Sequence, residues 1–275
     1  MSIFIVIALL GLLSTLSGFG VYFSKLKRNS APKVPIGISV ALVAGFVLGA
    51  LAISLSSGAT LLVRFVVAVP YLINLLMGSI FFFFFLQPKP PLNNIQIRKG
   101  EPILPFQSID NTGLAFLSDN LKGQRFLLKF YRGSWCPYCC AELKMFHEMK
   151  SDFDKYDVKT IALSTDDIEQ TVIHLKRDKL DMTLLSDPQL TVIKQYGVEH
   201  HKALSLDAGH VKKLFGIAFP FSKPSYRSIA IPTSLLVDEN GIIQWIDQSE
   251  DYRLRASRDN VLSALEKAFS SPLKI

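Results

Sequence analysis

Hydrophobic residues dominate the first part of the chain in three long stretches, residues 2–23, 36–56 and 65–86. At a rise of ~1.5 Å per residue, a helix of ~20 apolar residues crosses the ~30 Å hydrocarbon core of a bilayer. The first charge is Lys25, so the first stretch lacks the basic segment that opens a cleaved signal peptide. Residues 1–86 are therefore predicted to form a membrane anchor of three transmembrane helices, which makes the lipid bilayer a partner.

After an extended, proline-containing linker at 87–99, short apolar runs alternate with amphipathic ones. Strands are predicted at 125–131, 158–164 and 182–186, and helices at 137–156, 166–179 and 188–196. A hairpin over 232–248, with Asn240-Gly241 in its turn, and a helix at 258–269 close the chain. This order predicts one α/β domain over 100–275, with a sheet covered by helices on both faces. Residues 202–230 are predicted to be an insertion that serves as a lid, a partner surface or a membrane-resting loop.

The charge of the chain is divided unevenly. Residues 1–99 contain eight basic and no acidic residues, whereas all 23 acidic residues lie from Glu101 onward, beside 22 basic ones. The net charge of +7 therefore belongs to the segments that flank the apolar stretches. A domain with near-zero net charge lacks the basic surface that neutralises phosphates, so nucleic-acid binding is excluded.

Lysine and arginine placement predicts the orientation in the membrane. The loop after the first apolar stretch and the segment after the third are the basic ones, whereas Arg64 stands alone at the second loop; the basic residues are Lys25, Lys27, Arg28, Lys33, Lys89, Arg98 and Lys99. The rule places the C-terminal domain in the cytoplasm and the N-terminus outside. An error of one helix would place that domain on the periplasmic or extracytoplasmic side. Within the stretches, Gly45 and Gly49 are spaced for close packing inside the chain or in a dimer, and Asn74 is expected to form an interhelical hydrogen bond.

All three cysteines fall within five residues, Cys136, Cys139 and Cys140, at the junction of an apolar strand with a helix that begins near Pro137. A structural disulfide framework would spread cysteines along the chain. At a helix N-terminus, unpaired N–H groups and the positive end of the helix dipole stabilise thiolate over thiol. The cluster therefore predicts a redox or metal centre.

The residues around the cluster, with further segments in the same order, resemble the thioredoxin-like superfamily and, within it, the peroxiredoxin-like group (alkyl hydroperoxide reductase/thiol-specific antioxidant). The resemblance covers residues 100–275 and rests on Phe130-Tyr131-Arg132-Gly133-Ser134-Trp135-Cys136-Pro137-Tyr138-Cys139, Leu185-Ser186-Asp187-Pro188, Ile231-Pro232-Thr233 and Asp251-Tyr252-Arg253-Leu254-Arg255. It implies a thioredoxin-like fold, with a central mixed sheet flanked by helices, and antioxidant oxidoreductase activity. The substrate implied is a hydroperoxide or a protein disulfide, and the partner an external dithiol reductant.

The chain departs from that group at the site itself. Cys139 stands at the peroxidatic position, Cys136 replaces the Thr of the family motif, and Arg132 replaces its first Pro. Pro232 stands near the place of the family arginine and, with Thr233, resembles the cis-proline segment of thioredoxins. Arg132, Arg227 or Arg255 is then left to supply the cation of the pocket.

The two resemblances assign different first nucleophiles. Thioredoxin chemistry implies Cys136 as the attacking thiol and Cys139 as its resolving partner, whereas peroxiredoxin chemistry implies the reverse. Cys140 is expected to be structural or an auxiliary thiol. Trp135 and Pro137 are expected to shape the turn, and Arg132 either lowers a thiolate pKa or is solvated. The soluble part has no glycine-rich dinucleotide motif or P-loop, so no cofactor is predicted, and no metal is assigned.

Two other classes of function remain open. One is a copper metallochaperone of the thioredoxin superfold, which would use Cys136, Cys140 and a histidine from the pair His200-His201. The other is a redox-inert scaffold whose membrane part is the functional element. A periplasmic thiol-disulfide interchange protein is a further alternative within the redox class.

Overall fold

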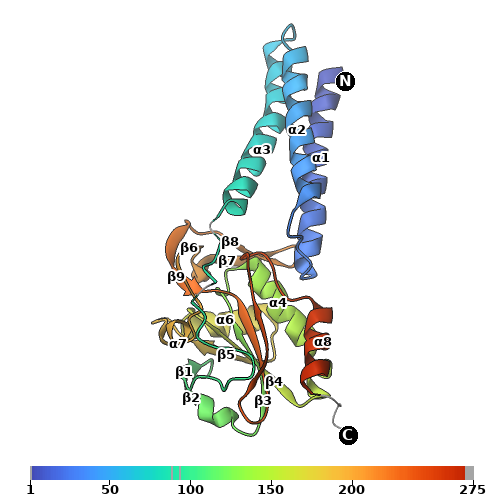
Figure 1. Cartoon of the computed structure of the whole chain (residues 1–275). Coiled ribbons are helices and arrows are strands. Elements are labelled where there is room, and N and C mark those ends of the chain that lie inside the picture. The colour runs from blue at the N-terminus through green and yellow to red at the C-terminus, as the bar shows by residue number, and fades with distance from the viewer. Residues whose placement is uncertain (1, 88, 93, 270–275) are drawn as a thin grey trace. The chain divides into compact units, whose positions relative to one another are not determined.

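The computed structural model describes residues 2–87, 89–92 and 94–269. The described residues divide into two compact units, one of three N-terminal helices and one that contains the chain from Lys89 onward. The helices of the first unit are α1 (Ile3–Lys27), α2 (Ile36–Leu55) and α3 (Leu61–Phe85) (Figure 1). Each is long and apolar enough to cross a membrane.

Small residues and one amide hold the three helices together. The Asn74 side chain donates a hydrogen bond of 3.1 Å to the Gly45 carbonyl oxygen, so the predicted interhelical bond is present. A Cβ on Gly45 would lie 2.8 Å from the Gly11 carbonyl oxygen of α1, and one on Gly49 would lie 2.6 Å from the Tyr71 ring of α3. The glycine pair therefore serves packing inside the chain, where a side chain would force the helices apart.

The second unit is built on a seven-stranded mixed sheet with the order β11-β10-β3-β4-β5-β1-β2. Strands β3, β4 and β5 are parallel, and the other neighbours are antiparallel. The strands are β1 (Gln107–Asp110), β2 (Ala115–Leu117), β3 (Arg125–Phe130), β4 (Val158–Ser164), β5 (Thr183–Ser186), β10 (Thr233–Val237) and β11 (Ile243–Gln248). The helices are α4 (Pro137–Glu148), α5 (Lys150–Asp154), α6 (Ile168–Asp178), α7 (Thr191–Gln195) and α8 (Arg258–Ala268), with short 3-10 turns at Ser118–Leu121 and Ala208–His210.

Strand β3 is buried on both faces, and its side chains alternate between the two sides of the sheet, where they contact different helices. Phe126, Leu128 and Phe130 join the main apolar core with residues of α7. Lys129 points to the opposite face, where it reaches Glu142 of α4. Helices therefore cover both faces of the sheet, as predicted.

The segment 202–230, expected as an insertion, folds into two small antiparallel ribbons. Strand β6 (Glu199–Ser205) pairs with β9 (Ser225–Ala230), and β7 (Val211–Leu214) pairs with β8 (Ile217–Pro220). Strand β8 packs against α4. The helix expected at 137–156 is divided, because Met149 leaves helical geometry at φ −90° and ψ 7° between α4 and α5.

Candidate active site

The N-terminus of α4 carries all three cysteines. Cys136 is the N-cap residue, Pro137 takes the first helical position, and Cys139 and Cys140 complete the first turn. Proline suits this position because its missing N–H would have no partner there. The Cys140 N–H donates a 3.0 Å hydrogen bond to the Cys136 carbonyl, so the spacing places Cys136 and Cys139 side by side at the helix end.

The turn before α4 depends on Gly133. Its φ of +142° lies in a region that side chains rarely adopt, and a Cβ there would lie 2.7 Å from the Trp135 ring nitrogen and 2.8 Å from Asp166 Oδ1. The buried Asp166 accepts a 2.6 Å hydrogen bond from the Ser134 N–H. The chain can therefore turn from β3 into α4 only with glycine at this position.

The three cysteines form no disulfide, and all are buried. Burial by itself raises the pKa of Cys139, but the hydrogen bond with Cys136 and the charge of Arg255 oppose it and hold the pKa well below its usual range. The pKa of Cys136 is raised well above its usual range, first by burial and then by its hydrogen bond with Cys139. Of the two sulfurs, Cys139 therefore carries the negative charge, and Cys136 stays protonated.

Arg255 supplies the cation beside that sulfur. Its Nη2 donates a 3.1 Å hydrogen bond to Cys139 Sγ, and its Nε lies 2.8 Å from Glu142 Oε2. Glu142 also pairs with Lys129 at 2.8 Å, and the Lys129 Nζ donates to Ser234 Oγ at 3.0 Å. The side chains of this Arg–Glu–Lys group are at most 1% exposed. Two buried cations with one carboxylate leave an uncompensated positive charge, and the Cys139 thiolate balances it.

Arg132 lies between two aromatic rings and is not solvated, so the second sequence alternative for this residue is wrong. Its guanidinium carbon is 4.9 Å from the Trp135 ring centroid and 4.6 Å from that of Tyr252, and its Nη2 donates to the Leu204 carbonyl. The Arg132 backbone N–H also hydrogen-bonds to the Cys139 sulfur. Trp135 and Tyr252 therefore hold the arginine between them, and β6 contacts it through the Leu204 carbonyl.

Thr233 is the first residue of β10, and Pro232 directly precedes that strand. No peptide bond among the described residues is cis, so the expected cis-proline is wrong. The Pro232 carbonyl accepts the Ser249 N–H, and Thr233 pairs with Phe130 of β3 and donates its hydroxyl to the Ile231 carbonyl. A trans bond is the default for proline by about 0.5–1 kcal/mol, and this strand pairing accommodates it.

Cys140 points away from the dithiol. Its Sγ donates a 3.2 Å hydrogen bond to the Ser134 carbonyl, and the Arg177 Nη2 donates to the same carbonyl at 2.9 Å. Burial raises the pKa of Cys140 well above its usual range, so this sulfur is a neutral thiol. Of the residues named for a copper site, Cys136 pairs with Cys139, the exposed His201 contacts Ser228, and His200 is buried within electrostatic reach of Arg132. Cys136 and Cys140 therefore have different partners, and the copper alternative stays a prediction.

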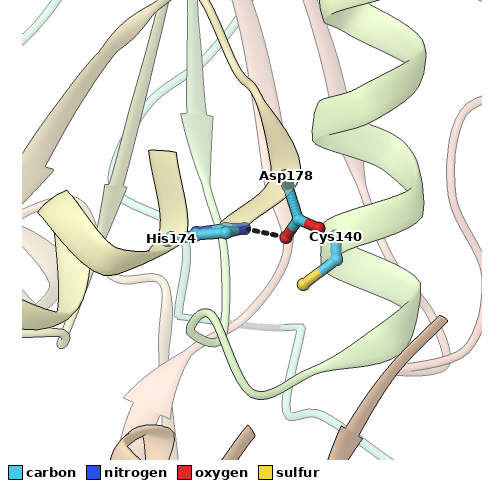
Figure 2. Close-up of side chains that lie close together, drawn as sticks. All are labelled: Cys140, His174 and Asp178. Atoms are coloured by element: carbon cyan, nitrogen blue, oxygen red, sulfur yellow. Dashed lines mark ion pairs between the residues drawn. The ribbon is translucent and has the colours of Figure 1, made fainter. Parts of the chain in front are cut away.

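Cys140 also lies beside His174 and Asp178 of α6, as Figure 2 shows, with the three possible ligand atoms within 4.8 Å of one another. Such a set resembles a zinc site. However, the Arg177 Nη2 is 3.3 Å from Cys140 Sγ and 2.6 Å from Asp178 Oδ2, and the Lys213 Nζ is 3.0 Å from Asp178 Oδ1. A divalent ion at this position would have to displace Arg177 and would be repelled by Lys213. The group therefore forms a salt-bridge network that stabilises the turn.

Sequence reasoning missed the residues that connect these sulfurs to the rest of the fold. Glu142, Asp166 and Arg177 carry no recognisable motif, because their partners are distant in sequence. Lys129 did carry a signal, since a lysine inside an apolar strand buried on both faces needs a charged partner. Arg255 was one of three candidates, and its guanidinium hydrogen-bonds to the Cys139 sulfur, while the charge of Arg132 also lowers the pKa of that thiol.

The AhpC/TSA family model matches residues 100–246. The chain belongs to the AhpC/TSA family. It is 29% identical over 150 residues to a putative peroxiredoxin bcp of Coxiella burnetii, covering 54% of this chain and 86% of the relative. It is 25% identical over 171 residues to peroxiredoxin Bcp of Escherichia coli, covering 62% of this chain and 97% of the relative.

Among solved structures, peroxidoxin BcpB from Mycobacterium tuberculosis superposes with a TM-score of 0.47 at 22% identity, covering 62% of this chain and 97% of that one. The predictions of a thioredoxin-like fold and of a peroxiredoxin-like oxidoreductase are confirmed for this AhpC/TSA member. The family model ends before Arg255, so the cation at Cys139 lies beyond the matched segment.

Proposed function

We propose that this chain is a membrane-anchored thiol peroxidase in which Cys139 attacks the hydroperoxide and Cys136 resolves the product. The observation that carries the proposal is the buried Arg255–Glu142–Lys129 group, whose excess positive charge is balanced by a thiolate at Cys139. A thiolate is the nucleophile in thiol chemistry, and it forms here at the peroxidatic position of the family.

The reaction balances with the residues present. The Cys139 thiolate attacks one peroxide oxygen, the O–O bond breaks, and the alkoxide leaves as the alcohol after it takes up a proton, which leaves a sulfenic acid on Cys139. The Cys136 thiol then attacks that sulfur, forms the Cys136–Cys139 disulfide and releases water. An external dithiol reduces the disulfide through a mixed disulfide and completes the cycle.

The burial of the two sulfurs favours a small peroxide over a protein disulfide as the substrate. Cys139 is 0% exposed and Cys136 1%. Attack on a protein disulfide needs a second polypeptide to approach the sulfur in line, whereas a peroxide needs only a narrow path. The three apolar helices support a multi-pass anchor, and the basic loop residues support a cytoplasmic domain, where thiols are kept reduced.

Stopped-flow mixing of the reduced full chain with hydroperoxide tests the assignment. Cys136→Ser is expected to react once and stop as a sulfenic acid, which mass spectrometry detects at Cys139, whereas Cys139→Ser is expected not to react. If Cys139→Ser still consumes peroxide and Cys136→Ser does not, the order of attack is the reverse. If the chain reduces insulin disulfides and not peroxide, the disulfide-exchange alternative replaces the proposal.

A membrane-impermeant alkylating reagent tests the predicted side of the membrane. Applied to intact cells that express the tagged chain, the reagent is expected to leave the cysteines unlabelled. In a second sample, which is lysed and unfolded before the reagent is added, the cysteines are expected to be labelled. To separate burial from topology, Leu114→Cys adds an exposed thiol in the same domain. Labelling of that thiol in intact cells would place the domain outside.

A further inference from the structure

The hairpin of β7 and β8 presents a phenylalanine at a position that neither folding nor turn geometry explains. Its two-residue turn is Phe215-Gly216, with φ of 50° and 78°. Turns with positive φ at both positions favour Asn-Gly, and a left-handed conformation is unfavourable for a residue with a large side chain. Phe215 is 90% exposed, so its ring recovers nothing from burial in the domain. The side chain is therefore available for contact outside the domain.

The surroundings of this tip are apolar and basic. Leu214 is exposed next to the turn, and Phe221 is exposed at the other end of the hairpin, where the Lys212 Nζ lies 5.9 Å from the Phe221 ring centroid. Between Asp207 and Asp238 the chain has no acidic residue, whereas it has Lys212, Lys213, Lys223 and Arg227. Lys213 pairs with Asp178 and Arg227 donates to Ser205, which leaves Lys212 of β7 and Lys223, in the loop after β8, as exposed cations of this segment.

The inner side of the hairpin is fixed. Ile217 and Ala218 are buried, and β8 packs against α4, the helix that carries the dithiol. The hairpin is therefore held to the domain next to its turn, where the Phe215 ring is exposed without any unfolding of the domain.

Chain length keeps this domain close to whatever surface holds the apolar helices. Helix α3 ends at Phe85, and Leu92 already packs against the apolar core of the domain. Seven residues span at most about 25 Å when fully extended. A domain of this size has a radius of gyration of about 16 Å, so its surface remains within reach of the bilayer. An exposed aromatic ring flanked by lysines matches the boundary between anionic headgroups and acyl chains.

We infer that the β7–β8 hairpin docks on an anionic bilayer, with the Phe215 ring in the headgroup–acyl boundary and Lys212 and Lys223 against lipid phosphates. This inference rests on the anchored arrangement in the proposed function and not on the peroxidase chemistry. It assigns the segment 202–230 the last of its three sequence alternatives.

Tryptophan fluorescence of the full chain in lipid nanodiscs tests the docking. Phe215→Trp adds an emitter at the tip, and Leu114→Trp is the matched control, because Leu114 is also an exposed residue of a hairpin, between β1 and β2. Each variant is compared with the wild type, which carries Trp135 and Trp245. With brominated lipids in equal parts phosphatidylcholine and phosphatidylglycerol, the added emission of Phe215→Trp is expected to fall about twofold or more, and that of Leu114→Trp to stay unchanged.

Equal quenching of the two added tryptophans would overturn the inference. Quenching that is the same in pure phosphatidylcholine would overturn the role given to the lysines. Phe215→Asn is the second variant: it suits the turn, so the chain is expected to keep or gain thermal stability and to keep its peroxidase activity. Failure of the chain to copurify with nanodiscs would contradict the anchor, whereas loss of peroxidase activity alone would contradict only the proposed chemistry.

Discussion

Removal of the Arg255 guanidinium is expected to raise the pKa of Cys139 and to slow every reaction of that sulfur. Arg255 Nη2 donates to Cys139 Sγ at 3.1 Å, and the arginine side chain is 1% exposed. Burial raises the pKa of Cys139, and it remains when the cation is lost. In Arg255→Gln the thiolate therefore loses a stabilising charge and keeps the cost of desolvation.

The size of the effect follows from the contact. Two charges 3.1 Å apart attract by about 5 kcal/mol at an effective dielectric constant of ~20, which is an upper bound. A hydrogen bond to a charged group is worth about 1.5–3 kcal/mol net, and this lower range applies because Arg132 and the Cys136 hydrogen bond remain. At ~1.4 kcal/mol per tenfold, the acid dissociation constant of the Cys139 thiol falls roughly 10- to 150-fold.

The assay is the rate of alkylation at Cys139, located by mass spectrometry, over a pH series. The inflection is expected to move to higher pH in Arg255→Gln, and Arg255→Lys, which keeps the charge, is expected to lie between that variant and the wild type. Arg258→Gln is the matched control, because it removes an equal charge from the surface pair with Asp152. If Arg255→Gln and Arg258→Gln share the inflection of the wild type, Arg255 does not stabilise the thiolate.

Three further predictions address the surroundings of the site. Glu142→Gln is expected to lower the free energy of unfolding by about 3 kcal/mol or more, measured in guanidinium chloride, because it leaves two buried cations without their carboxylate. Cys140→Ser is expected to change peroxide turnover by less than about threefold, since a hydroxyl can donate the same bond to the Ser134 carbonyl; a complete loss of turnover would show that Cys140 takes part in the chemistry. Burial, with the charge of Arg132, lowers the pKa of His200 to about 4. As the pH falls below 6.5, His200 takes up a proton in the unfolded chain, whereas in the folded chain it stays neutral down to about pH 4. The stability of the wild type is therefore expected to fall from pH 6.5 towards pH 4, and His200→Gln is expected to lose part of this pH dependence.

Much of the fold could be predicted because its signals are local. Strand β4 has the predicted bounds 158–164, and α8 agrees with its prediction to within one residue. The division of the helix at 137–156 was missed, because the apolar spacing continues past Met149 although the backbone does not. The ribbons of 199–230 were missed because β8 is buried against α4 and β6 against β9, and not within one periodic element.

The sequence alone determined the division into three apolar helices and a neutral α/β domain, the dithiol at a helix start, and the family frame around it. These features depend on hydropathy, on residue spacing and on the neighbours of each residue along the chain. The tertiary structure decided which sulfur carries the charge, because that depends on Arg255, which is 116 positions from Cys139. It also joined Lys129 to Glu142 across the sheet and the helix, and separated Cys140 from the dithiol. Electrostatic energies fall with distance in space, and only the fold brings these distant charges within a few ångströms of the sulfur.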